Sequence, residues 1–419
     1  MKMKFKFLGG ADMVGRMGMT IQAGEDTMLM EYGMSPTKPP EYPLPTEGRI
    51  KHTFLTHSHL DHCGMIPQVV GRDRCELFTT PLTAEVGEIM MHDSLKIAKA
   101  ENYPPTYSAG DIERTMKSVV PLTFGDEIEL DHCDVKLHSA GHIPGAAMFE
   151  FKNDTSTLYT GDIHTIRTRL VDGARPVDCE NLFIEGTYGG RFHPDRKETE
   201  KQFLEKVDEV IDRGGTVLVP SFAIGRTQEI MMMLKDSGYD MWVDGMGRSV
   251  TRLYNEYPEY LSNAKDLKAA KRKFNEVRTA HMRKDAKRAD VIVTTGGMLD
   301  GGPVLNYIKG LKDDPKNAVL LVGYQAEDTN GRMLCESGMI NVDGQPMKVE
   351  CELQKYDFSA HADHKQIVEF VRACDPKNVI MMHSETRELF LDEKQFPDYN
   401  LADYNVILPE VGKEFELDV

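Results

Sequence analysis

No apolar run in this 419-residue sequence approaches the roughly 20 residues that are needed to cross a bilayer. The first ten residues, MKMKFKFLGG, alternate lysine with apolar residues, which is typical of a half-buried strand and unlike a signal peptide. The seven cysteines are dispersed and include no Cys-x-x-Cys pair, which argues against a disulfide framework and a thiolate zinc finger. We therefore expect a cytoplasmic protein with no membrane contact.

Basic residues are fewer than acidic ones, 50 against 67, and the net charge of -17 argues against a general nucleic-acid-binding surface. The segment Lys265–Arg288 is the exception, with ten lysines and arginines against three acids. Its local charge of +7 leaves -24 for the remainder of the chain. The segment is either a solvated helix face or a phosphate-binding surface, and the choice depends on the chemistry found elsewhere.

Short strands dominate the first part of the chain, and helices alternate with strands in the second. The strands expected in the first part are Lys4–Leu8, Thr27–Glu31, His52–Thr56, Val135–His138, Met148–Phe151, Thr157–Thr160 and Leu182–Glu185, with helices near Pro81–Ala100 and Ala109–Val119. The elements expected after Tyr188 are a helix over Asp195–Arg213, a strand over Thr216–Val219, a helix from Gly225, a strand over Met241–Asp244, a long basic helix and a strand over Val291–Thr294. This alternation predicts a parallel, doubly wound α/β unit.

A dense group of potential metal ligands follows the strand His52–Thr56. The run Thr56-His57-Ser58-His59-Leu60-Asp61-His62 holds three histidines and one aspartate within six residues. Zinc readily takes imidazole nitrogen and carboxylate oxygen, and a loop beyond a strand can fold such side chains around one centre. A lone His-x-His is a weak signal, whereas His-x-His-x-Asp-His is a specific one. His142 and Asp162, each preceded by a glycine at the end of a later strand, are further candidates.

In this order the ligand motifs resemble those of the metallo-β-lactamase superfamily. Later motifs resemble its nucleic-acid-processing β-CASP branch, which includes RNase J and archaeal proteins similar to the endonuclease of the cleavage and polyadenylation specificity factor. These later motifs are Ile184–Gly189, Pro220–Arg226, Gly323–Ala326, Phe358–Asp363 and Met382–Glu385. The resemblance runs over nearly the whole chain and implies a zinc-dependent ribonuclease that acts in RNA processing or decay.

The resemblance also implies a role for each matching residue. The implied metal ligands are His57, His59 and His142 for one zinc ion, Asp61, His62 and His383 for a second, and Asp162 as the bridge between them. The implied catalytic residues are Asp61, Glu185 and His361, and the implied substrate contacts are Ser359, Ser384 and Arg226. Arg226 could equally cap a helix.

The chemistry is consistent with these roles. Two zinc ions about 3.5–4 Å apart acidify a shared water and stabilise the charge that develops on an attacked phosphate. His361, held by Glu185 through its other ring nitrogen, is a reasonable proton donor to the departing ribose oxygen. We expect a 5′-phosphate and a 3′-hydroxyl as products. The sequence leaves open whether cleavage is endonucleolytic or 5′→3′ exonucleolytic, which RNA is cut, and whether the chain forms a homodimer or joins a processing complex.

Three positions depart from the family's usual pattern. Met13 stands where a glutamate is usual, Glu31 where an aspartate supports the ligand loop, and Gly186 where a serine is usual. None is expected to touch zinc directly, so the departures bear on how the ligands are held in place.

The expected architecture is a four-layer αββα metallo-β-lactamase fold formed by residues 1–187 and completed by residues 348–419. A doubly wound α/β (β-CASP) domain is inserted over residues 188–347, and we expect the active site where the two domains meet. The glycine-rich segments 294–303 and 323–332 follow strands, but they lack a Gly-Lys-Ser/Thr sequence and therefore form no nucleotide P-loop.

Other functions on this scaffold are a DNA-processing nuclease and a catalytically silent scaffold subunit of a processing complex. His383 favours the ribonuclease, since DNA-directed relatives typically place an apolar residue at the matching position. Silent relatives lose metal ligands, whereas all seven are present here. A small-thioester or β-lactam hydrolase would account for the zinc ligands but not for the inserted domain.

Overall fold

A computed structural model describes residues 2–418, which form two compact units. The first unit comprises Met1–Arg167, Asp172–Phe192 and His361–Val419, and the second comprises Thr168–Val171 and His193–Ala360. None of the helices within residues 2–418 has the length and apolarity of a bilayer-crossing segment.

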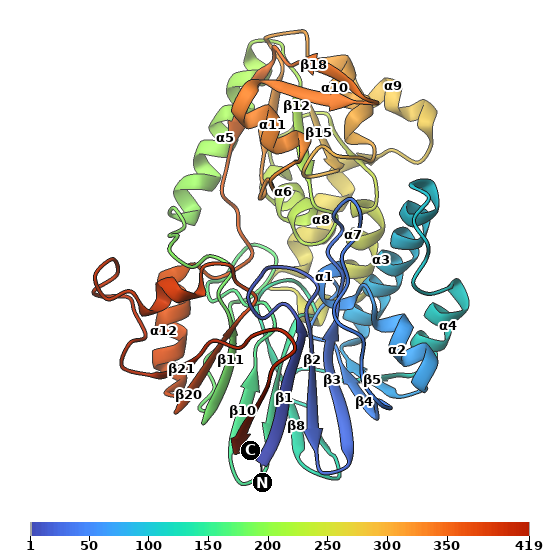
Figure 1. The fold of residues 1–419 in the computed structure, drawn as a ribbon. Coiled ribbons are helices and arrows are strands. Elements are labelled where there is room, and N and C mark those ends of the chain that lie inside the picture. Colours follow the sequence, from blue (N-terminus) through green and yellow to red (C-terminus); the bar gives the residue numbers. More distant parts are fainter. Residues whose placement is uncertain (1, 419) are drawn as a thin grey trace. The chain divides into compact units, whose positions relative to one another are not determined.

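Two seven-stranded sheets form the centre of the first unit (Figure 1). The first sheet has the order β22 (Glu414–Asp418), β1 (Lys2–Gly9), β2 (Gly18–Ala23), β3 (Asp26–Tyr32), β4 (His52–Phe54), β5 (Glu76–Thr79) and β6 (Val119–Pro121). The second has the order β21 (Asn405–Ile407), β20 (Asn378–Met382), β11 (Asn181–Glu185), β10 (Ser156–Tyr159), β9 (Ala147–Lys152), β8 (Asp134–Ser139) and β7 (Glu127–Glu129). Strands from the C-terminal segment thus enter both sheets.

The inner faces of the two sheets pack on one another through a shared apolar core. Phe5 and Phe7 of the first sheet and Phe149 and Phe183 of the second belong to this core, and the ring centroids of Phe5 and Phe183 are 5.0 Å apart. Because side chains alternate along a strand, one face of β1 enters the core while its lysines face outward.

Helices cover the outer faces of both sheets. The helical elements in the described part of this unit are α1 (Leu60–Cys63), α2 (Ile66–Asp73), α3 (Pro81–Ala100), α4 (Ala109–Lys117), α12 (His364–Cys374) and η3 (Arg387–Leu391). Ile66 and Val70 of α2 pack with Leu29 and Leu77 on the outer face of the first sheet. α12 contacts β11 of the second sheet. The predicted αββα layering is confirmed.

The second unit is built on one parallel sheet of six strands. Its order is β14 (Phe274–Glu276), β13 (Met241–Asp244), β15 (Val291–Thr295), β12 (Val217–Ser221), β16 (Ala318–Leu321) and β19 (Glu352–Lys355). Its other elements are α5 (Arg196–Asp212), α6 (Arg226–Leu234), α7 (Gly247–Glu256), η1 (Pro258–Tyr260), α8 (Ala264–Lys273), η2 (Ala280–Met282), α9 (Arg283–Ala286), α10 (Val304–Leu311), α11 (Asn330–Ser337) and the hairpin β17 (Met339–Val342) and β18 (Gln345–Lys348). All neighbouring strands of the sheet are parallel, as a doubly wound unit requires.

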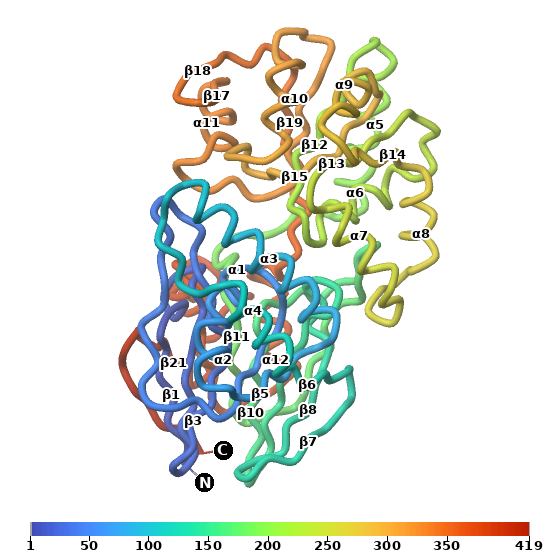
Figure 2. Tube along the Cα trace, turned by 90° about the vertical axis from the view of Figure 1, so that its right-hand side faces the viewer, coloured from blue at the N-terminus to red at the C-terminus, as the bar shows by residue number. Residues whose placement is uncertain are grey.

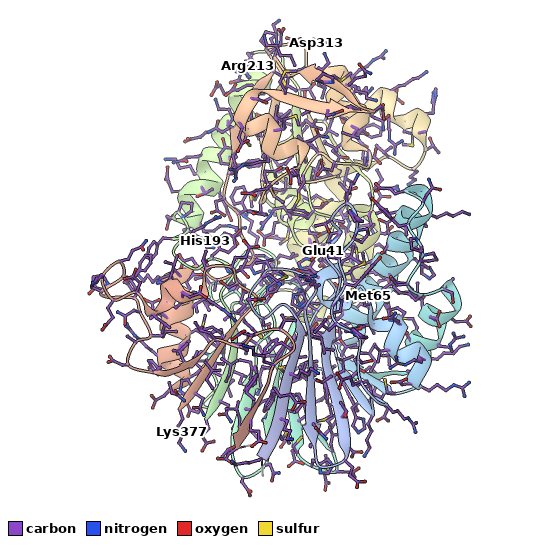
Figure 3. The ribbon with its side chains drawn as sticks, in the orientation of Figure 1. Glu41, Met65, His193, Arg213, Asp313 and Lys377 are labelled. Carbon is purple, nitrogen blue, oxygen red and sulfur yellow. The ribbon has the colours of Figure 1, made fainter. Side chains whose placement is uncertain are left out.

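Two features of this unit differ from the sequence pattern. β19 lies beyond residue 347 and is an edge strand of the parallel sheet. Its Glu352 forms an ion pair at 2.6 Å with Arg213, the residue directly after α5 (Arg213 is labelled in Figure 3). The prediction of one long basic helix is wrong. α8 ends at Lys273 because Phe274 is buried and pairs with Met241 of β13.

Candidate metal centre

The ligand loop begins where β4 ends and is tied to neighbouring strands. The backbone N–H of Thr56 donates to Glu31 Oε1 at 2.9 Å. The carbonyl oxygen of Asp61 accepts the N–H of Met17 at 2.7 Å. The same carbonyl lies so close to Gly33 that a Cβ there would be 1.7 Å from it. Only glycine permits this approach, which seats the loop against the end of β3.

A first group of candidate ligands lies at the start of the loop and at two later strand ends. His59 Nδ1 is 3.2 Å from His57 Nε2 and 3.1 Å from His142 Nε2. Asp162 Oδ2 is 3.5 Å from His57 Nε2 and 3.8 Å from His142 Nε2. One ligand atom from each of the four residues lies within 4.8 Å of the others, which is compatible with a single cation.

A second group consists of Asp61, His62 and His383. Asp61 Oδ2 is 3.9 Å from His62 Nε2 and 3.5 Å from His383 Nε2. Asp162 also reaches this group, because its Oδ2 is 3.4 Å from His62 Nε2 and its Oδ1 is 3.1 Å from His383 Nδ1. Asp162 therefore lies between the two groups.

The donor set fits a cation. Burial lowers the pKa of His59 to about 4 and that of His57 well below 6.5, so both rings are neutral. Burial would raise the pKa of Asp162, but the charges of His62 and His383 outweigh it and hold the carboxyl ionised. The side chains of His62 and Asp162 are buried. Within residues 2–418, neither ring nitrogen of His62 forms a hydrogen bond, and Oδ1 of Asp162 forms none either. Buried polar atoms of this kind are stabilised by a bound ion.

Glu31 reaches the loop from a bulge in β3. Gly18 pairs with Tyr32 and Met19 with Met30, so Glu31 is the extra residue, and its φ of 58° lies in the left-handed region. Its carboxylate is fully buried and places Oε2 3.3 Å from His62 Nδ1. The bulge thus turns Glu31 toward a candidate ligand and orients its ring.

Glu185 and His361 lie beside the first group. Both carboxylate oxygens of Glu185, at the end of β11, are 3.0 Å from His361 Nδ1, and the N–H of Ile163 also donates to Glu185 at 2.8 Å. Burial alone would lower the pKa of His361, but the charges of Glu185 and Asp162 outweigh it and raise the pKa above 6.5. The side chain is about one fifth exposed, so the ring is open to solvent on one side.

His164 was not foreseen from the sequence. It is buried, and its Nδ1–H donates to the carbonyl oxygen of His361 at 3.0 Å. The N–H of Ala362 donates to Ile163 at 2.7 Å, so two bonds hold the segment that carries His361. The one signal for His164 in the sequence was its position two residues after Asp162, because alternate residues of an extended segment share a face.

His383, directly after β20, is held in the left-handed region with φ 51°. The N–H of Gly15 donates to its Nε2 at 3.1 Å, and the hydroxyl of Thr187 lies 3.3 Å from its Nδ1. The backbone carbonyl of Gly10 accepts the N–H of His383 at 2.7 Å. Two segments distant in sequence therefore fix this ring.

The three expected substrate contacts lie in different surroundings. Ser384 is fully buried in the first unit, and its Oγ accepts the N–H of Thr386 at 3.1 Å. Ser359 and Arg226 belong to the second unit. Arg226 is the first residue of α6, and its guanidinium lies 6.0 Å from the ring centroid of Phe358.

Two family models match the chain. The model described as Beta-Casp domain matches residues 227–334, and the model described as Zn-dependent metallo-hydrolase RNA specificity domain matches residues 346–390. The second match includes His361 and His383.

Curated relatives are similar over nearly the whole chain. A protein named "Probable RNase MJ4" from Methanocaldococcus jannaschii is 34% identical, covering 99% of this chain and 100% of the relative. "RNase aCSPSF2" from Saccharolobus solfataricus is 34% identical over 98% of this chain and 85% of the relative. "Transcription termination factor FttA" from Methanocaldococcus jannaschii is 34% identical over 91% of this chain and 67% of the relative.

Proposed function

Because the chain belongs to the β-CASP branch of the metallo-β-lactamase superfamily, we propose that it is a zinc-dependent ribonuclease that hydrolyses phosphodiester bonds in RNA. The observation that carries the proposal is the geometry of the first unit. Seven candidate ligands form two groups that Asp162 contacts, and Asp162 also forms a third group with the His361–Glu185 pair. The names of two similar proteins as RNases support RNA as the substrate class.

The ligand groups are suited to two zinc ions. His57, His59 and His142 would hold one, Asp61, His62 and His383 the other, and Asp162 would contact both. When bound, zinc supplies Lewis acidity that lowers the pKa of water and stabilises negative charge on a phosphate. Imidazole and carboxylate ligands without thiolate fit zinc in a hydrolytic site.

His361 is the proposed proton donor. Glu185 contacts Nδ1 of its ring, and we assign the transferred proton to Nε2. Water adds to phosphorus and loses a proton to solvent, the bond to the 3′ oxygen breaks, and that oxygen takes the proton from Nε2, which is then reprotonated from solvent. The products are a 5′-phosphate and a 3′-hydroxyl. Glu185 stabilises the protonated ring before the step and orients it throughout.

The direct test is incubation of the zinc-loaded protein with 5′-labelled and internally labelled RNA and with DNA of the same sequence. We expect cleavage of RNA, little cleavage of DNA, and loss of activity with a chelator. Early release of mononucleotide from the 5′ label would indicate 5′→3′ exonuclease action, and internal fragments would indicate endonuclease action. Equal cleavage of DNA would favour the DNA-processing alternative instead.

The role of His361 is tested by the His361→Ala variant. Because His361 is assigned as proton donor and not as ligand, we expect two zinc ions per chain by elemental analysis and a cleavage rate lower by about 10²–10⁴-fold. A 3′-thio linkage has a better leaving group and should recover much of the lost rate. Loss of a zinc ion would make His361 a ligand. No recovery with the thio substrate would make it a phosphate-positioning group.

A second candidate function is that of a weakly active subunit in an RNA 3′-end processing or termination complex. The similarity to a protein named as a transcription termination factor favours it. The intact ligand groups favour an active enzyme, because a silent subunit has no need to keep them. Multiple turnover of RNA by the purified chain alone would support the ribonuclease, and activity only with added partners would support the subunit.

A further inference from the structure

The basic segment Lys265–Arg288 contributes to a hollow at one edge of the second unit. The hollow has a volume of about 510 Å³ and lies among α7, α8 and β14, where β14 is the edge strand of the parallel sheet. Figure 2 shows these three elements along one side of the unit. Four of the lining side chains are basic, namely Lys268, Lys271, Arg272 and Arg278.

The fold of α8 brings three of these charges together. Asn263 caps the helix by accepting the N–H of Asp266, and Leu267 and Ala270 are buried against the unit. Lys268, Lys271 and Arg272 are spaced three and four residues apart and therefore lie within about one helical turn, roughly 5.4 Å along the axis. They stand near the helix C-terminus, where positive charge is favoured by the helix dipole.

These charges have no acidic partners. Within residues 2–418, Lys268, Lys271 and Arg272 form no ion pair. Glu276 is the one acid that lines the hollow, and Arg278 engages it at 3.4 Å. Three positive charges therefore face the hollow uncompensated, in a chain whose net charge is -17.

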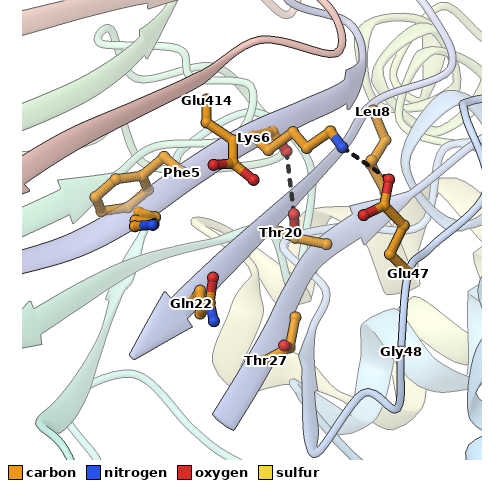
Figure 4. A pocket seen from close by; sticks show the side chains of 10 residues that line it. Phe5, Lys6, Leu8, Thr20, Gln22, Thr27, Glu47, Gly48 and Glu414 are labelled. Atoms are coloured by element: carbon orange, nitrogen blue, oxygen red, sulfur yellow. Dashed lines mark hydrogen bonds and ion pairs between the residues drawn. The ribbon is translucent and has the colours of Figure 1, made fainter. Parts of the chain in front are cut away.

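A second hollow, on the first unit, shows the contrast (Figure 4). It has a volume of about 260 Å³ and is lined by two lysines and two glutamates, Lys4, Lys6, Glu47 and Glu414. Lys6 Nζ contacts Glu47 at 2.9 Å. Its charges balance, so it offers no net attraction to an anion.

We propose that the hollow on α7, α8 and β14 (the α8 groove) binds the sugar-phosphate backbone of single-stranded RNA. This inference rests on the proposed function, since it assigns a second contact for the same substrate. A polyanion is repelled by the acidic bulk of the chain and is attracted where unpaired cations gather in a concave surface. Contacts of this kind fix position along the strand without reading the bases.

The test compares two triple variants in the second unit. The groove variant carries Lys268→Glu, Lys271→Glu and Arg272→Glu. The control variant changes three exposed lysines outside the hollow to glutamate, Lys197, Lys316 and Lys355, with the same change in net charge. A third variant with glutamine at the three groove positions guards against misfolding, and thermal unfolding is compared for all.

Binding of a fluorescently labelled 20-nucleotide RNA is measured by anisotropy, with His361→Ala in every protein so that the RNA stays intact. Three lost phosphate contacts on a single strand lower the salt-dependence slope by about 2. Raising salt from about 50 to about 200 mM should therefore weaken binding by the parent about 20-fold more than binding by the groove variants.

The outcomes separate the two proposals. Weaker binding and a flatter salt dependence in both groove variants, with the control near the parent, would support the α8 groove. Equal effects of groove and control variants would overturn it and leave only a long-range charge effect. Absence of RNA cleavage by the protein with His361 intact would instead contradict the proposed function, whatever the binding data show.

Discussion

Glu31 offers a sharp test of how the candidate centre is held together. Its Oε1 accepts the N–H of Thr56 at 2.9 Å, and its Oε2 lies 3.3 Å from Nδ1 of His62. In the Glu31→Gln variant the amide oxygen can still accept from Thr56. The amide nitrogen would then face the His62 nitrogen, and two donors would oppose each other in a fully buried place.

The magnitude follows from the charged contact between Glu31 and His62, to which we assign the strength of a hydrogen bond to a charged group. A hydrogen bond to a charged group contributes about 1.5–3 kcal/mol net. Since about 1.4 kcal/mol corresponds to a factor of ten in an equilibrium constant, the group that contains His62 should bind zinc roughly 10–100-fold more weakly. Within residues 2–418, Glu31 forms no hydrogen bond or ion pair with His57, His59 or His142, so the zinc affinity of their group should change little.

The assay is a competition titration of zinc against a chromogenic chelator, which resolves two affinities. The matched control is Glu150→Gln, because Glu150 is also buried and also contacts a histidine, His138, at 2.7 Å, away from the ligand groups. The control should lower thermal stability and leave both zinc affinities unchanged. If the Glu31→Gln variant bound both zinc ions with wild-type affinity, the assignment of Glu31 as the support of His62 would be refuted.

Two further predictions concern the same centre. The Asp162→Ala change removes the carboxylate common to both ligand groups, so elemental analysis should show a loss of zinc from both and cleavage should collapse; a variant that keeps two zinc ions would contradict the bridging assignment. The Gly33→Ala change would place a Cβ 1.7 Å from the Asp61 carbonyl oxygen. Thermal melting should therefore show destabilisation by about 1–3 kcal/mol, and the zinc content should fall. The control is Gly301→Ala, which should behave as wild type in both measurements because no atom lies within 4 Å of the added Cβ.

The elements that the sequence predicted well are those whose pattern is local. α3 spans Pro81–Ala100 and β13 spans Met241–Asp244, as their periodicity indicated. The structure also brings the closely spaced side chains of the ligand motif together in two neighbouring groups, as a loop after a strand permits. All seven cysteines are free; six are buried as small apolar residues, and Cys335 is exposed.

Elements that depend on distant partners were missed. β2, Gly18–Ala23, has glycine, glutamine and alanine with weak strand preference, and it is a strand because β1 and β3 pair with both of its edges. The basic segment breaks at Phe274 for the same reason, because burial against β13 outweighs helix preference. His164 acts through a backbone carbonyl almost 200 residues away in the chain, which no local pattern reveals.

A carboxylate that belongs to two ligand groups makes their occupancies cooperative. Asp162 approaches His57 and His62 with the same oxygen, so a cation in either group would fix the carboxylate for the other. The second cation would then bind to a carboxylate that is already ordered and would cost less conformational entropy. This is positive cooperativity without any change of fold. We expect the first zinc ion to strengthen binding of the second. Activity would then rise more steeply with the zinc supply than it would for two independent sites.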